Sequence, residues 1–114
     1  MELAFSTLYD FNIVSVSGQI NSLKDSIQLK SEINTLIEDK KNKIALDLKE
    51  MDYVDSAALN VFIYAKSLAE KTGGHFCILE PNEYILNMLS VVGLLNVFTI
   101  CDNRDSLKIL AGNS

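Results

Sequence analysis

The sequence contains little proline and glycine and no excess of positive charge. One proline and five glycines in 114 residues, with 48% hydrophobic and 22% charged residues, indicate a globular chain and exclude collagen-like or disordered tracts. Ten Lys and Arg residues against 15 Asp and Glu residues give a formal net charge of −5. Because binding to nucleic acids and to anionic membranes depends on positive charge, the sequence disfavours direct contact with either.

Long apolar runs are also missing. The longest, such as 91–95, are far shorter than the roughly 20 residues that a bilayer span requires. The first residues include Glu2 and turn polar at Ser6, unlike a signal peptide. We therefore expect a soluble, cytoplasmic protein that does not insert into a membrane. The length fits a single domain covering 1–114.

Cysteine and histidine are scarce, which limits the possible chemistry. Cys77 and Cys101 lie in apolar runs without metal-ligand spacing, so we expect two buried thiols and no metal site. His75 is the only histidine, and no Gly-x-Ser-x-Gly motif accompanies it, which argues against a serine hydrolase. A glycine-rich phosphate loop is absent too. We expect no catalytic activity and no cofactor.

Hydrophobic spacing predicts an α/β fold. From residue 44 onward strands alternate with helices, which is typical of a mostly parallel sheet with right-handed crossovers. The first two strands form an antiparallel pair, and Gly18 ends the second. The first helix begins after Ser22 and buries a stripe that includes Leu23 and Ile27. We expect strands at 3–8, 12–17, 44–48, 75–79 and 97–101, and helices at 23–37, 58–69, 85–92 and 105–111.

One segment departs from simple packing. Between a buried strand and the best-defined helix, four carboxylates and one lysine give a local charge of −3, and we expect this run to be a solvated loop and docking surface. Ser56 follows at the first turn of the helix, where unpaired N–H groups can meet a phosphate. The alternative interpretation is that Asp55 and Ser56 only cap the helix. The charged residues of the run are Asp47, Lys49, Glu50, Asp52 and Asp55.

Several short motifs follow one another along the chain. The segment 53–59, Tyr-Val-Asp-Ser-Ala-Ala-Leu, follows a strand; a Gly-Gly pair stands at 73–74 and Val-Gly-Leu at 92–94. The segment 17–21, Ser-Gly-Gln-Ile-Asn, precedes the first expected helix. In this order and spacing the motifs resemble the anti-sigma factor antagonist branch of the STAS domain family, in which a turn like 17–21 also precedes the first helix. The similarity extends from about residue 14 to residue 110. It implies a mixed, mostly parallel sheet covered by helices mainly on one face.

The resemblance also implies a switch in binding partners. In this family the unmodified domain binds an anti-sigma factor, often itself a serine protein kinase, and frees the sigma factor. Phosphorylation of the matching serine, Ser56, ends the binding, and a serine phosphatase restores it. The docking surface would consist of the turn 18–22, the loop 53–56 and the start of the next helix. Its candidate partner-binding residues are Asn21, Ser22, Tyr53, Asp55, Ser56, Ala57 and Asn60.

Two residues differ from the family pattern. Ala58 stands where glycine is common, and its methyl group is expected to narrow the approach of a partner's backbone. Asn21 stands where aspartate is common, which removes one charge from the docking face.

Two other functions compete with this one. The carboxylates of the acidic run could hold Mg²⁺, as in a phosphoacceptor receiver domain, but the first strands lack the acidic pair that a receiver needs. A second alternative is a STAS-type interaction subunit of a transport or signalling complex, in which Ser56 is never modified. The fold alone does not separate these uses.

Overall fold

The computed structural model describes residues 1–112, which form one mixed sheet and its covering helices. The strand order is β1-β2-β3-β5-β6, and β4 pairs with the far end of β2. β1 and β2 are antiparallel, and the other pairs are parallel, so the α/β prediction is confirmed. The elements are β1 (Glu2–Leu8), β2 (Phe11–Ile20), α1 (Leu23–Glu38), β3 (Lys43–Asp47), β4 (Met51–Val54), α2 (Ser56–Lys71), β5 (His75–Leu79), α3 (Glu83–Val91), β6 (Thr99–Cys101) and α4 (Ser106–Gly112).

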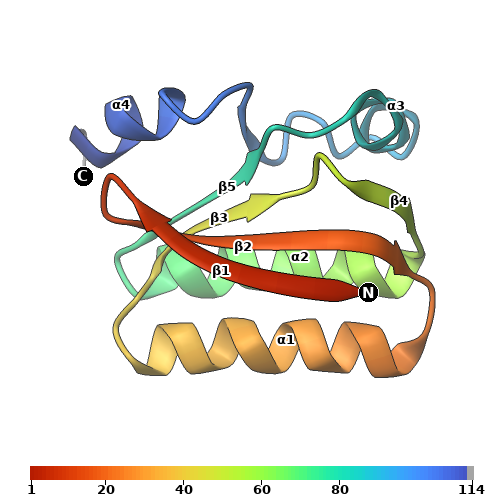
Figure 1. Cartoon of the computed structure of the whole chain (residues 1–114), viewed down its shortest axis with the longest axis horizontal. Helices are drawn as coiled ribbons and strands as arrows, with labels where there is room; N and C mark the ends of the chain where they lie inside the picture. Colours follow the sequence, from red (N-terminus) through yellow and green to blue (C-terminus); the bar gives the residue numbers. More distant parts are fainter. Residues whose placement is uncertain (113–114) are drawn as a thin grey trace.

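The two longest helices cover one face of the sheet (Figure 1). α1 and α2 lie next to each other, with α1 below the strands and α2 behind β1 and β2 in this view, and the main core between them and the sheet includes Val14, Leu46 and Phe62. α4 covers part of the opposite face, over a smaller cluster that includes Phe11 and Leu107. The sheet is therefore covered mainly on one face, as the family resemblance implied. Within residues 1–112, no helix combines the length and apolarity that crossing a membrane requires.

The acidic run contains a strand that the sequence did not predict. β4 has only four residues, and only Met51 and Val54 at its ends are buried, which is too short for a recognisable alternation. The prediction that Gly18 ends the second strand is wrong, since β2 continues to Ile20. Gly18 adopts φ +85° at a bulge where β2 changes its partner from β3 to β4. This change of partner brings β4 into the sheet.

Two further predictions need correction. The first helix buries Ser26, Leu29 and Ile33, whereas Leu23 and Ile27 are 70% and 58% exposed. The two-residue link from β2 fixes the rotation of α1, so that the small Ser26 faces the sheet in place of Ile27. The last strand is shorter than expected because residues 97–98 precede the ladder, and only Thr99–Cys101 pairs with β5.

Candidate functional site

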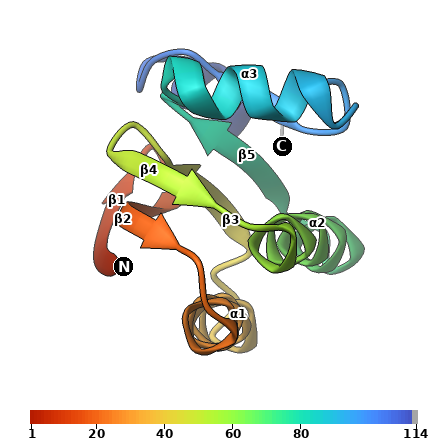
Figure 2. The same ribbon diagram turned by 90° about the vertical axis from the view of Figure 1, so that its right-hand side faces the viewer.

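Two chain turns that are distant in sequence meet at one end of the sheet. β2 and β4 are parallel neighbours, with Ile20 opposite Val54, and Asp55 N donates to Ile20 O at 3.0 Å. Each strand leads within one or two residues into a helix, β2 into α1 and β4 into α2. Figure 2 looks along both helices from their N-terminal ends, which lie near each other. The fold thus brings together the two turns that the family resemblance assigns to docking.

Both helices at this end are capped by side chains of the candidate set. Ser22 Oγ accepts a hydrogen bond from Asp25 N at 3.2 Å, and Asp55 Oδ1 accepts one from Ala58 N at 2.9 Å. The interpretation of Asp55 as a helix cap is therefore confirmed. Asn21 Nδ2 donates to Gln19 Oε1 at 2.8 Å, which ties its side chain to its own turn. These contacts hold the two turns in place without using Ser56.

Ser56 is exposed and lies at the first position of α2. Within residues 1–112 its hydroxyl group has no hydrogen-bond partner. Tyr53 is 45% exposed on the preceding strand, and Asn60 is exposed one helical turn after Ser56. Ala57 is half-buried. The candidate docking residues therefore form one surface around an unengaged hydroxyl group.

Ala58 does not belong to this surface. Its side chain is fully buried in the main core, so the methyl group that replaces the family's hydrogen atom packs inward. The expectation that Ala58 narrows the approach of a partner is wrong in this conformation. The residue instead supplies apolar contact between α2 and the sheet.

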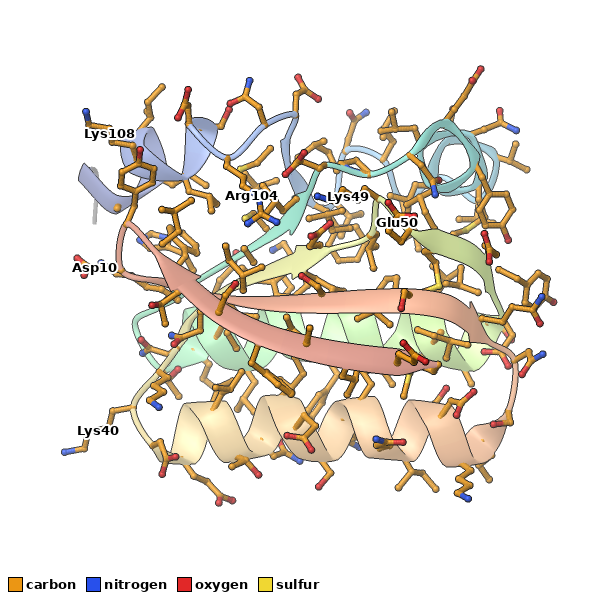
Figure 3. The ribbon with its side chains drawn as sticks, in the orientation of Figure 1. Asp10, Lys40, Lys49, Glu50, Arg104 and Lys108 are labelled. Carbon is orange, nitrogen blue, oxygen red and sulfur yellow. The ribbon has the colours of Figure 1, made fainter. Side chains whose placement is uncertain are left out.

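Asp47 was expected in the solvated part of the acidic run, and this is wrong. It is 3% exposed and accepts hydrogen bonds from Ser15 Oγ at 3.1 Å, Lys49 N at 3.2 Å and Arg104 Nη2 at 3.1 Å. Arg104 Nε also lies 3.1 Å from Glu80 Oε1. Figure 3 shows Arg104 and Lys49 on the side of the sheet away from α1 and α2. Asp47 therefore holds the β3–β4 turn in place through Lys49 N, and the exposed charges of the acidic run come from its other residues.

Arg104 is a structural residue that the sequence analysis missed. No local motif marks it, since its partner Asp47 is 57 residues earlier in the chain. We expect Arg104→Met to lower the free energy of unfolding by about 2 kcal/mol, because Asp47 then keeps a buried charge without its cation. Urea denaturation measures the loss.

The Arg104 prediction has an internal control. In the double variant Asp47→Asn with Arg104→Met, the buried charge is absent, and the further loss caused by Arg104→Met should shrink to well under half of its value in the unmodified background. An equal loss in both backgrounds would show that the guanidinium group contributes packing alone.

Outside the candidate docking surface, the described residues include two thiols and one histidine. Cys77 and Cys101 are buried, as expected. The hydrogen bond that the Cys77 thiol donates to Cys101, together with burial, raises the pKa of Cys77, which keeps it protonated. Among residues 1–112, no group of three or more His, Cys, Asp or Glu side chains is arranged to hold a metal ion. His75 begins β5 and is half-buried, far in sequence from Ser56.

Comparison with known proteins agrees with this architecture. The family model of the STAS domain matches residues 5–107, so the chain belongs to the STAS domain family. BtrV of Bordetella bronchiseptica, which is named provisionally as an anti-sigma factor antagonist, is 23% identical over 106 residues, covering 93% of this chain and 90% of BtrV.

Solved structures have the same fold. The structure of TM1081 from Thermotoga maritima, also named provisionally as an anti-sigma factor antagonist, superposes with a TM-score of 0.86 at 22% identity, covering 96% of this chain and 94% of TM1081. The anti-sigma factor antagonist SpoIIAA in its unphosphorylated form gives a TM-score of 0.75 at 14% identity, covering 99% of each chain.

Proposed function

We propose that this protein is an anti-sigma factor antagonist controlled by phosphorylation of Ser56. The unmodified form binds an anti-sigma factor that is also a serine protein kinase, and the sigma factor is released. Phosphorylation of Ser56 ends the binding, and a serine phosphatase restores it. Membership of the STAS family and the names of BtrV and SpoIIAA support the antagonist role.

The observation that carries the proposal is the position of Ser56. Its hydroxyl group is exposed and unengaged, whereas the neighbouring side chains of Ser22 and Asp55 are occupied as helix caps. A kinase can therefore reach Ser56 without breaking a hydrogen bond. The fold requires no particular side chain at this position, so its hydroxyl group is available for regulation.

The surroundings of Ser56 explain how a phosphate would act. The first-turn N–H groups of α2 attract an anion. One of them, Ala58 N, already donates its hydrogen bond to the Asp55 carboxylate, and the negative charge of this carboxylate repels a phosphate on Ser56. A phosphate adds about −1.5 to −2 charge to a surface that includes the exposed Asp52. A partner that docks on Tyr53 and Asn60 would have to desolvate this dianion. The fold then tolerates the phosphate while the interface does not.

The proposed activity is binding, without catalysis by this chain. Within residues 1–112 no base is hydrogen-bonded to the Ser56 hydroxyl group, and its proposed role is that of a substrate for the partner kinase. The candidate interface comprises Asn21, Ser22, Tyr53, Asp55, Ser56, Ala57 and Asn60.

Phosphosite mapping by mass spectrometry tests the proposal in the cells that produce the protein. We expect phosphate on Ser56, with occupancy that changes between growth and stress, and no phosphate on Ser22, whose hydroxyl group caps α1. An anti-sigma factor with a kinase fold should co-purify with the unmodified form. Unmodified Ser56 under every condition, with a transporter subunit co-purifying instead, would contradict the proposal.

A further inference from the structure

As described over residues 1–112, the sheet has three free strand edges, and two of them are protected. β6, at one end of the sheet, has only three residues. The outer edge of β4 is covered by α3, where Asn82 Nδ2 donates to Met51 O at 2.7 Å and Val54 N donates to Tyr84 Oη at 3.4 Å. Short strands and covering elements are the usual means of preventing a sheet edge from pairing with another chain.

Within the described residues, β1 at the other end of the sheet has none of these protections. Its seven residues, ELAFSTL, include no proline, lysine or arginine, and Glu2 at its start is the only charge. Five of the seven are exposed, among them Phe5 at 52%. Figure 2 shows β1 at the left margin of the sheet, on the side away from α2. A long strand edge whose only charge is at one end is a template for strand pairing.

The hairpin register shows which backbone groups of β1 point outward. Tyr9 and Asp10 form a two-residue turn with φ of 51° and 70°, and Leu8 lies opposite Phe11. The residues that flank such a turn form a hydrogen-bonded pair. Along an antiparallel ladder, hydrogen-bonded pairs alternate with non-hydrogen-bonded pairs. Leu8, Ser6, Ala4 and Glu2 therefore bond to β2. Leu3, Phe5 and Thr7 direct their N–H and C=O groups away from the sheet.

We propose that β1 is a dimerisation edge and that its partner is β1 of a second copy of this chain, paired antiparallel about Phe5. In this register Phe5 lies opposite Phe5 of the copy, and Leu3 lies opposite Thr7. All three outward-facing residues then find outward-facing partners, and each pair exchanges two backbone hydrogen bonds. If the two copies were instead paired about Ala4 or about Ser6, one outward-facing residue of each β1 would lie opposite a residue outside β1 of the copy. A second copy suits this edge because the register centred on Phe5 pairs the exposed phenylalanines with each other and places no charged side chain opposite another.

The side chains support the same register. Phe5 lies opposite Val14, which packs in the core below the sheet, so Phe5 is on the face covered by α1. A groove of about 410 Å³ lies beside it, lined by residues of β1 and α1 that include Thr7 and Leu36. In the dimer the two phenylalanine rings meet across the strands and border these grooves. Glu2 lies opposite Leu8 of the copy, so no like charges are opposed.

Sedimentation equilibrium tests the dimer. A single strand pair is a small interface, so we expect an equilibrium in which the apparent mass rises with concentration from 12.7 kDa towards twice that value, 2 × 12.7 = 25.4 kDa. Phe5→Lys should remain at 12.7 kDa throughout, because it places two ammonium groups opposite each other. Val91→Lys on α3, at a residue that is 78% exposed, should behave as the unmodified protein. A monomer at every concentration up to about 1 mM, or dimerisation by Phe5→Lys, would overturn the proposal.

Cysteine cross-linking tests the register. Two Phe5→Cys copies would have Cα atoms about 5.5 Å apart, which permits a disulfide under mild oxidation. Two Thr7→Cys copies would be separated by about 14 Å, and no cross-link should form. Cys77 and Cys101 are buried and do not compete. A cross-link of Thr7→Cys and none of Phe5→Cys would exclude the proposed pairing.

Discussion

Ser56→Asp is expected to weaken binding to the anti-sigma factor by about 2 kcal/mol, or roughly thirtyfold in the dissociation constant. The carboxylate places a fixed charge beside Asp55, on a surface that the partner must desolvate. Ser56→Ala should bind as tightly as the unmodified protein, because the hydroxyl group makes no hydrogen bond within residues 1–112. Isothermal titration calorimetry with the purified partner measures both constants.

The same helix offers a matched control for charge. Ser67 is also an exposed serine of α2, 11 residues and roughly 16 Å along the axis from Ser56. Ser67→Asp adds an identical charge to the same helix, and we expect it to bind as the unmodified protein does. Equal weakening by the two variants would indicate a general effect of net charge, and equal binding by all of them would remove the switch from the account.

Gly74→Ala is expected to lower the free energy of unfolding by about 3 kcal/mol. A Cβ atom at Gly74 would lie 2.0 Å from Asn42 O, and this carbonyl also accepts a hydrogen bond from His75 N at 3.0 Å. Because the contact is with backbone, relief requires a shift of the loop that leads into β3. Thermal and guanidinium denaturation of the purified variant measure the loss.

The same substitution at the adjacent Gly73 serves as a control, because it distinguishes the effect of steric crowding from that of backbone strain. Gly73 has φ +85° and nothing within 4 Å of a Cβ position, so Gly73→Ala has only a conformational penalty of about 1 kcal/mol. We therefore expect Gly74→Ala to be clearly the more destabilising of the two. The opposite order would mean that the Asn42 loop relaxes freely.

This glycine pair illustrates what the sequence could and could not predict. The pair was expected to end the second long helix, and it does, since Gly73 N donates to Glu70 O and Gly74 N to Ala69 O. Such local signals also predicted the caps Ser22 and Asp55. The close approach of Gly74 to Asn42 depends on tertiary packing and has no signature in the neighbouring residues.

The errors in the candidate site have the same origin. Asp47 looked like one more exposed carboxylate of an acidic run, and its burial depends on hydrogen bonds from residues distant in sequence, Ser15 and Arg104, as well as from Lys49 N. β4 was missed because four residues are too few for a pattern, yet it places Ser56 beside the turn after β2. Motif order proposes the residues of the docking surface, and that assignment stays a prediction. Their assembly into one surface required the change of β2 partner at Gly18.

Release of a sigma factor in a purified system tests the central proposal most directly. The anti-sigma factor and its sigma factor, both from the same genome, are mixed to form their complex, and free sigma factor is measured by gel filtration after this protein is added. The unmodified protein should release the sigma factor, and protein phosphorylated at Ser56 should not. Ser56→Ala should still release it after treatment with kinase and ATP. Equal release by the unmodified and phosphorylated forms, or no release by either, would contradict the proposed switch.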